Sequence, residues 1–403
     1  MKNAFITVLI VTVLLGAAAV GLLALDNAQV NGKRSKAMAD AQATYSEQKA
    51  AYDQEIADIE AQDRADQAAY DEAVRKYNEQ LKENGGVSMG WPSPATGQGW
   101  EIVDLTDYGL DQTATVTMDK QELVYNGLLL VNQWHSRPTW FNDSAPVNLH
   151  NHNKELRLDN HNITLLESAA DAWGTMLADV SLKYGWDYFM IYRGYRTYEE
   201  QEKLFNEQKQ KLSGSYTDEG ELLAATARRV NLPGTSEYNT GLSAWPRLYK
   251  NGDAAINAKD KDFFASEEGI WMVEHSWEYG FVFRFPLADY PVRGTQDKSY
   301  KTGVSTKLRL FRYVGRGNAA AMHIMDLCLE EYLEFLQDHW HIAIYQDGTL
   351  KYEIFLQNLP ETITSGTLDD VENVSFLQST KPSIVNQEFM YDNLGHIITV
   401  IEY

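Results

Sequence analysis

The stretch from Pro233 to Trp245 constrains the fold of this 403-residue chain more than any other part of the sequence. It reads PGTSEYNTGLSAW, a polar turn with a proline and two glycines that leads into an apolar run. Glycine reaches backbone conformations that other residues rarely adopt, so we expect a tight turn here. The apolar run is typical of a buried strand. A turn that brings polar side chains to the end of such a strand is laid out like the edge of an active site.

Three further blocks, at residues 193–205, 271–286 and 302–315, accompany this stretch. Together the four resemble the VanY-type D-alanyl-D-alanine carboxypeptidases, zinc enzymes that trim the stem peptide of bacterial peptidoglycan and share their fold with LytM-like and hedgehog domains. Two family signatures read roughly P-G-x-S-E-H-x-T-G-L-A-V-D and T-G-x-x-x-E-P-W-H-F-R-Y-V-G. The matching residues here are Pro233, Gly234, Ser236, Glu237, Thr240, Gly241, Leu242, Thr302, Gly303, Phe311, Arg312, Tyr313, Val314 and Gly315.

The positions that would carry catalysis do not match. The resemblance places the three zinc ligands on Tyr238, Trp245 and Leu310, and the general base on Lys307. Leucine has no donor atom, an indole N–H donates rather than ligates, and a tyrosine would first have to ionise. A lysine that is protonated at neutral pH repels a metal ion. We therefore expect no catalytic residue, no metal ligand and no cofactor at this site, although the resembled family uses zinc.

Some of the family's substrate groove is retained. The resemblance places Arg196 where the family receives the terminal carboxylate of the stem peptide, a contact that suits a planar guanidinium. We expect Arg196, Tyr198, Ser236, Lys307 and Arg309 to bind an anionic ligand. The alternatives are that Arg196 forms a structural salt bridge and that Ser236 only caps the turn.

Composition excludes other functions. The net charge of −22 argues against nucleic-acid binding, because such proteins need a positive surface. The single cysteine, Cys328, cannot form an internal disulfide and reads as a core residue. Two histidine clusters, at residues 150–161 and 339–341, lie in a polar loop and at a helix end, and both are interpreted as structural.

Residues 4–25 form an uncharged apolar run long enough to cross a membrane as a helix. We predict an uncleaved anchor, with the globular domain outside the cytoplasm, since the resembled enzymes act on the cell wall. A cleaved signal peptide is the alternative. Residues 35–84, rich in Ala, Glu, Gln, Asp and Lys, predict a long helical arm. The arm is either a self-associating coiled coil, which would make the chain a homo-oligomer, or a solvated spacer.

The predicted fold class is α+β, with a small antiparallel sheet flanked by helices. The predicted domains are an anchor (1–30), an arm (35–84), a linker (85–100), a VanY-like domain (101–340) and a C-terminal β appendage (341–403). Within the globular part, periodicity predicts the strands 128–132, 188–192, 312–315, 342–346, 352–356 and 396–401 and the helices 164–184, 199–212 and 319–338.

Three functions remain open. The first is a membrane-anchored pseudo-peptidase that binds peptidoglycan stem peptide or a cell-envelope protein. The second is an active D-Ala-D-Ala carboxypeptidase with an atypical metal site. The third is an assembly module without a ligand.

Overall fold

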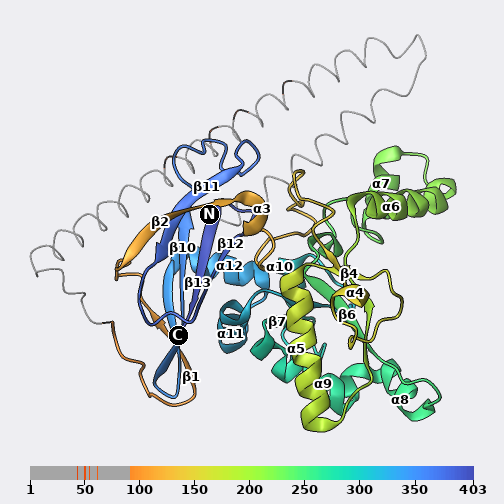
Figure 1. The fold of residues 1–403 in the computed structure, drawn as a ribbon. Coiled ribbons are helices and arrows are strands. Elements are labelled where there is room, and N and C mark those ends of the chain that lie inside the picture. Colours follow the sequence, from red (N-terminus) through yellow and green to blue (C-terminus); the bar gives the residue numbers. More distant parts are fainter. Residues whose placement is uncertain (1–42, 44–49, 51–53, 55–60, 62–90) are drawn as a thin grey trace, which may run out of the picture. The chain divides into compact units, whose positions relative to one another are not determined.

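A computed structural model describes residues 91–403 and the single residues 43, 50, 54 and 61 (Figure 1). The chain divides into two compact units. One consists of Met1–Ser88 and Lys209–Ala225, and the other of Met89–Gln208 and Thr226–Tyr403. The predicted anchor, all but four single residues of the predicted arm, and residues 85–90 of the predicted linker lie outside the described residues.

In the first unit the description covers chiefly residues 209–225. There the end of α6 (Tyr198–Leu212) leads through η1 (Ser213–Ser215) to the start of α7 (Glu219–Ala227). A small apolar cluster joins Leu212, Tyr216 and Leu222. The Lys209 Nζ atom lies 2.5 Å from Glu219 Oε1, so an ion pair also ties this helical hairpin together.

The second unit contains two main antiparallel sheets. The four-stranded sheet has the order β5-β6-β8-β7 and carries the Pro233–Trp245 stretch. Its strands are β5 (Phe189–Arg193), β6 (Ser243–Leu248), β7 (Phe281–Phe283) and β8 (Phe311–Tyr313). The five-stranded sheet has the order β1-β9-β10-β13-β12. Its strands are β1 (Trp100–Asp104), β9 (His341–Gln346), β10 (Thr349–Asn358), β12 (Asn386–Tyr391) and β13 (His396–Glu402).

Shorter elements complete the unit. Two pairs of strands form separate two-stranded sheets, β2 (Thr113–Asp119) with β11 (Asn373–Ser379), and β3 (Val147–Asn148) with β4 (Thr164–Leu165). The helices are α3 (Lys120–Leu123), α4 (Leu149–His152), α5 (Glu167–Tyr184), α8 (Ala254–Lys259), α9 (Glu267–His275), α10 (Ser299–Thr302), α11 (Arg316–Met325) and α12 (Leu329–Asp338). The 3-10 turns are η2 (Glu237–Thr240), η3 (Asp260–Ala265) and η4 (Ser276–Tyr279).

The predicted α+β class, with small antiparallel sheets and helices, is therefore confirmed. Helix α5 packs its apolar face against the four-stranded sheet, where Trp173 lies 4.7 Å from Phe281 between ring centroids. Helices α11 and α12 pack on the five-stranded sheet through residues such as Leu333 and Ile354. Each main sheet thus buries one face under helices, as expected for antiparallel sheets.

Two secondary-structure predictions need correction. Residues 128–131 are buried but belong to no strand, and only Asn132 forms an isolated bridge, with His135. The helix predicted at 319–338 is two helices, because Asp326 adopts a left-handed conformation that ends α11. A new N-terminus then forms at Cys328, whose backbone N–H donates to Glu331. Strands β9, β10, β12 and β13, which lie in the predicted appendage, share one sheet with β1.

The predicted localisation is contradicted. None of the helices among residues 91–403 is both long enough and apolar enough to cross a membrane. Helix α5, with 18 residues, is the longest of them and carries charged residues such as Asp171 and Asp179. Residues 4–25, on which that prediction rested, lie outside the described residues, and we do not retain the membrane localisation.

Candidate functional site

A buried turn forms the frame of the candidate site. Gly234 has φ +81°, and its carbonyl accepts a hydrogen bond of 2.7 Å from the Arg137 backbone N–H. The turn continues into η2, which ends at Gly241 with φ +72°. The Gly241 carbonyl accepts from the Leu166 N–H at 2.8 Å, just before α5 begins. The two signature glycines therefore allow backbone conformations that fix the turn against the rest of the domain.

Four buried charged residues hold this frame from inside. Arg284 donates from Nη1 and Nη2 to both carboxylate oxygens of Glu330, at 2.9 and 2.7 Å, and from Nε to Glu237 at 2.8 Å. Arg312 donates to the other oxygen of Glu237. Although burial opposes ionisation, Arg312 and Arg284 lower the pKa of Glu237. The signature's glutamate and arginine are thus a structural ion pair.

The same network also forms hydrogen bonds with the buried segment 127–132. Arg312 donates from Nη2 to the carbonyls of Gly127 and Leu129, at 2.6 and 2.8 Å. The Ser243 hydroxyl donates to Glu237 at 3.0 Å, and the Asn132 amide donates to Glu330 at 3.1 Å. Residues 127–132 can therefore lie in the core without forming a strand, because side chains donate some of the hydrogen bonds that their backbone carbonyls require.

The residues at the zinc-ligand positions come from three elements. Tyr238 lies on η2, Trp245 on β6, and Leu310 directly before β8. Leu310 is 1% exposed, and its carbonyl accepts from the Arg284 N–H. Lys307, at the general-base position, is exposed, and its Nζ lies 5.3 Å from the centroid of the Tyr290 ring.

Aromatic rings and arginines pack around two of these positions. The Trp245 ring lies edge to face with Tyr192, 6.3 Å between centroids. Arg193 contacts both rings, with its guanidinium carbon 5.0 Å from Tyr192 and 5.9 Å from Trp245. Arg196 lies 4.9 Å from the Tyr238 ring. The arrangement is a set of cation–π contacts, each worth about 0.5 to 2 kcal/mol depending on exposure.

These residues do not fit a zinc ion. Burial raises the pKa of the Tyr238 phenol to about 12, although Arg193 and Arg196 oppose the shift. The phenol is therefore protonated at neutral pH, Trp245 offers only an indole N–H, and Leu310 offers no donor. The three positions cannot supply the nitrogen, oxygen or sulfur ligands that zinc requires.

The five predicted ligand-binding residues differ in their exposure and in their contacts within the protein. Arg196 donates to Gln201 Oε1 at 2.7 Å, and burial lowers its pKa. Tyr198 is 43% exposed beside Gly234, whereas Ser236 is buried and makes no capping bond from its side chain. Arg309 and Lys307 complete the set.

Arg309 is engaged elsewhere. It donates from Nη1 to Asp260 Oδ1 at 2.6 Å and from Nη2 to the Asp260 carbonyl at 2.7 Å. Its guanidinium also lies 4.3 Å from the Phe263 ring. Arg309 thus stabilises η3, whereas Lys307 remains exposed.

Sequence reasoning missed Arg193. This exposed arginine is the register partner of Trp245, and among the described residues no ion pair to a carboxylate engages it. Only the pairing of β5 with β6 reveals its position, although its place at the end of a predicted strand was a usable signal. The buried network was also missed, because the charged residues that pair in it are 46 to 75 positions apart in the sequence.

Histidines form contacts outside this site. His150 and His161 stack with ring centroids 3.8 Å apart, and His341 Nε2 lies 3.1 Å from buried Glu353. His152 lies 2.6 Å from Asp171, and with Glu167 these residues have donor atoms within 4.8 Å of one another. That exposed group belongs to α4 and α5, not to the elements that carry the signature positions.

Comparisons with known proteins agree with the fold and the signature. A family model described as VanY, D-alanyl-D-alanine carboxypeptidase, matches residues 162–316. A D-alanyl-D-alanine carboxypeptidase of Enterococcus faecium is 30% identical over 258 residues, covering 63% of this chain and 71% of the relative. One from Enterococcus faecalis is 28% identical over 242 residues, covering 60% and 77%.

A solved structure supports the fold alone. The vancomycin-resistance D,D-dipeptidase VanXYg, in complex with a D-Ala-D-Ala phosphinate analogue, has a TM-score of 0.50 at 24% identity. The match covers 73% of this chain and 100% of that chain. Fold and signature together are those of a class of zinc-dependent D,D-carboxypeptidases. The chain belongs to the VanY D-alanyl-D-alanine carboxypeptidase family.

Proposed function

We propose that this member of the family binds a ligand ending in a carboxylate, such as a peptidoglycan stem peptide, and does not hydrolyse it by the family's zinc chemistry. The observation that carries the proposal is the set of residues at the ligand positions, Tyr238, Trp245 and Leu310. They support it because none offers a ligand at neutral pH.

The cations near these positions supply the binding part of the proposal. Arg196 and Arg193 both act on the Tyr238 hydroxyl electrostatically, so the two guanidiniums lie near the same group. Like charges held close together repel, and an anion between them relieves that repulsion. A terminal carboxylate can accept charge-assisted hydrogen bonds from either guanidinium. Positive charge would then attract the ligand in place of a metal.

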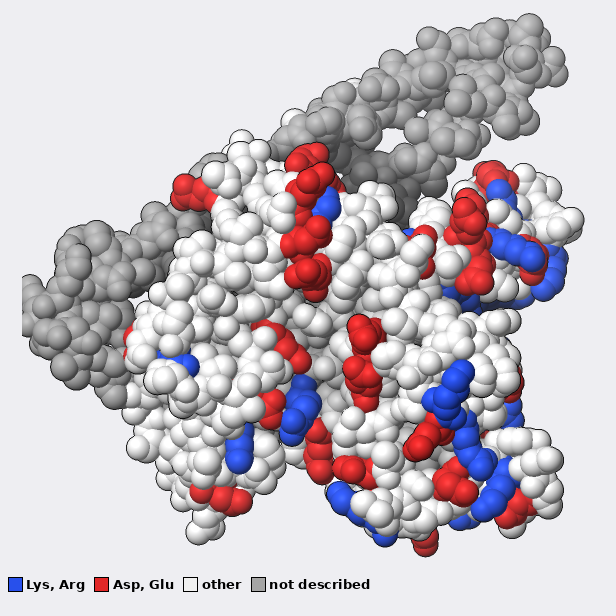
Figure 2. Space-filling view, viewed as in Figure 1, with Lys and Arg blue, Asp and Glu red and all other residues white. Residues whose placement is uncertain are grey.

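Surface charge is consistent with a local rather than a general anion site. On the face shown in Figure 2, acidic and basic side chains of the described residues are interspersed. The whole chain carries a net charge of −22. The net negative charge would repel a polyanion such as nucleic acid. A single carboxylate beside the arginines lies within about one Debye length of them, so salt screens that attraction less than it screens distant charges.

Matched peptides test the proposal. Isothermal titration calorimetry compares an N-acetylated peptide ending in D-Ala-D-Ala with the same peptide bearing a C-terminal amide. Binding of the acid with little binding of the amide is expected, weakening as salt is added. Equal heats from the two peptides, or none from the acid at millimolar concentration, would leave the assembly-module reading in place.

The active-enzyme alternative gives a different result with the same acid peptide. Hydrolysis would release D-alanine during the titration. Mass spectrometry of the solution recovered from the calorimeter would then detect the shortened peptide. Intact peptide after binding agrees with the proposal.

A further inference from the structure

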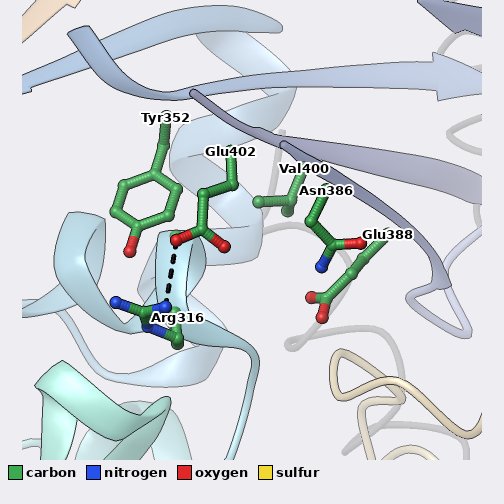
Figure 3. Close-up of a pocket in the computed structure, with 7 residues that line it drawn as sticks. Arg316, Tyr352, Asn386, Glu388, Val400 and Glu402 are labelled. Atoms are coloured by element: carbon green, nitrogen blue, oxygen red, sulfur yellow. Dashed lines mark hydrogen bonds and ion pairs between the residues drawn. The ribbon is translucent and has the colours of Figure 1, made fainter. Parts of the chain in front are cut away.

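A cavity lies on the five-stranded sheet, where α11 begins (Figure 3). Its volume is about 180 Å³, which is room for roughly six water molecules at the density of the liquid. The side chains of Arg316, Glu388 and Glu402 are directed into it. Neither the zinc-ligand positions nor the general-base position lines this cavity.

Strand register explains why these side chains meet. Tyr352 on β10 and Asn386 on β12 are both register partners of Glu402 on β13, and Glu388 is the partner of Val400. Residues two apart on a strand share a face. The five side chains therefore belong to one face of the sheet, which α11 covers.

Close packing leaves no protein side chain to fill the cavity. A Cβ atom on Gly317 would lie 2.6 Å from Val400 Cγ1, so the first turn of α11 is as close to the sheet as it can be. Gly315 has φ +82°, and a Cβ there would lie 3.1 Å from Glu388 Oε2. The backbone at the start of the helix thus forms one wall beside the Glu388 carboxyl.

The charges that line the cavity do not balance. Arg316 Nη1 lies 2.9 Å from Glu402 Oε1, so the one guanidinium is paired with one of two carboxyls. Among the described residues no lysine or arginine forms an ion pair with Glu388. Burying a carboxylate without a cation is unfavourable, and in such a place a carboxyl usually takes up a proton instead.

Glu388 shows that response. Burial and the neighbouring Glu402 raise its pKa to about 7, while Arg316 and a hydrogen bond from Asn386 oppose the rise. The charge of Glu388 in turn acts on Tyr313 and Tyr352, phenols whose own pKa values burial raises. The positive charge at the start of α11 is only a fraction of a full charge, so it does not replace the missing cation.

We propose that this cavity binds a primary ammonium group, with Glu388 and Glu402 as its acceptors. An ammonium carries three donors and one positive charge. Glu388, Glu402 and the side-chain oxygen of Asn386 offer the acceptors, and the added charge balances the second carboxyl. This inference is independent of the proposed function, because it uses other residues and a ligand of opposite charge.

An adjoining cavity provides the approach. It has a volume of about 360 Å³ and shares Arg316, Tyr352 and Glu402 with the first. Trp100 and Trp277 lie there edge to face, 5.4 Å between centroids. Aromatic faces suit the alkyl chain that carries an amine and attract its charge.

Calorimetry on the full chain with n-butylamine tests the proposal, with 1-butanol as the neutral control of the same shape. We expect the amine to bind and the alcohol not to bind. At pH 6 binding should release up to about one proton, because the amine replaces the proton on Glu388, and at pH 8.5 the release should vanish. Titration in two buffers of different ionisation enthalpy measures that release.

Two isosteric variants decide where binding occurs. Glu388→Gln should weaken amine binding by about tenfold or more and abolish the proton release. Glu372→Gln, the same change at an exposed position outside the cavity, should leave both unaltered. Equal amine binding by wild type and Glu388→Gln, or no binding by folded wild type, overturns the proposal. Tight binding of CaCl2 that depends on Glu388 and excludes the amine would also overturn it, in favour of a divalent-cation site.

Discussion

Arg193 on β5 and Trp245 on β6 are register partners, and the Arg193 guanidinium carbon lies 5.9 Å from the centroid of the Trp245 ring. The position that holds the second zinc ligand in the resembled family is therefore occupied by an aromatic side chain in contact with a cation. Tyr238 repeats this pattern with Arg196, at 4.9 Å. Aromatic rings in contact with arginines thus occupy two of the positions at which the resemblance places zinc ligands.

Arg196→Ala should weaken binding of an acid-terminated peptide by about 10- to 150-fold, equivalent to about 1.5 to 3 kcal/mol, because it removes a charge-assisted hydrogen bond. Calorimetry at two salt concentrations measures the change. Gln201→Ala is the matched control, since it removes the hydrogen bond that Arg196 donates to Gln201 and retains the positive charge of Arg196. If Arg196→Ala binds as wild type does while Arg193→Ala does not, Arg193 is the anion receptor instead.

Restoring the family residues should restore the metal. The triple variant Tyr238→His, Trp245→Asp and Leu310→His supplies three ligands on a frame whose turn and buried ion pairs are retained. We expect elemental analysis to find close to one zinc per chain in this variant. Lys307→Glu alone supplies a carboxylate without ligands and should bind none. A triple variant with an unchanged circular dichroism spectrum and no zinc would show that these side chains do not converge on one point.

Removing one member of the buried network should be costly. Arg284→Met leaves Glu330 buried without the two hydrogen bonds that Arg284 donates, and breaking such a pair costs about 3 to 5 kcal/mol of unfolding free energy. Urea denaturation measures the loss. Lys250→Ala, which breaks an exposed ion pair of 3.3 Å with Asp187, should cost less than about 1 kcal/mol. Similar losses in the two variants would mean that the network is not a determinant of stability.

Stability should depend on pH through Glu388. Its folded-state pKa of about 7 lies above the ordinary value of 4.5, so the folded state holds a proton that the unfolded state loses. The resulting penalty is absent below pH 4.5, grows as pH rises, and is complete above pH 7.

The variant Glu388→Gln removes this penalty. The full shift would correspond to about 3 kcal/mol, which partial exposure reduces to about 1 to 2 kcal/mol. We expect Glu388→Gln to be as stable as wild type at pH 4.5 and more stable at pH 8, measured by urea denaturation. Glu372→Gln controls for the change in net charge. A stability difference between Glu388→Gln and wild type that stays constant with pH would contradict the raised pKa.

Local sequence signals predicted the parts of the fold that depend on near neighbours. Helix α5 begins at Glu167 and β5 at Phe189, each close to where periodicity placed it. The break between α11 and α12 was missed because its residues have ordinary helical composition, and only the left-handed Asp326 ends the first helix. Pairing of β1 with β9 joins residues far apart in sequence, which no local pattern reports.

For the candidate site, the signature indicated which positions to inspect but not how the substituted residues are held. Arg309 was expected in the groove, yet it pairs with Asp260, which no motif marks. The charge imbalance around Glu388 arises from two strands and a helix end, so it is visible only after folding. The identities of substituted residues are in the sequence, whereas their partners come from tertiary packing.

If the proposed function is right, this chain does not perform the zinc hydrolysis of its family. The most direct test equilibrates the purified chain with excess zinc, removes unbound metal, and then measures zinc per chain and D-alanine released from a peptide ending in D-Ala-D-Ala. We expect no D-alanine release, and any zinc retained should be lost in the variant His152→Ala, which removes a donor from the exposed group on α4 and α5. One zinc per chain that persists in His152→Ala, together with D-alanine release abolished by a chelator, would contradict it.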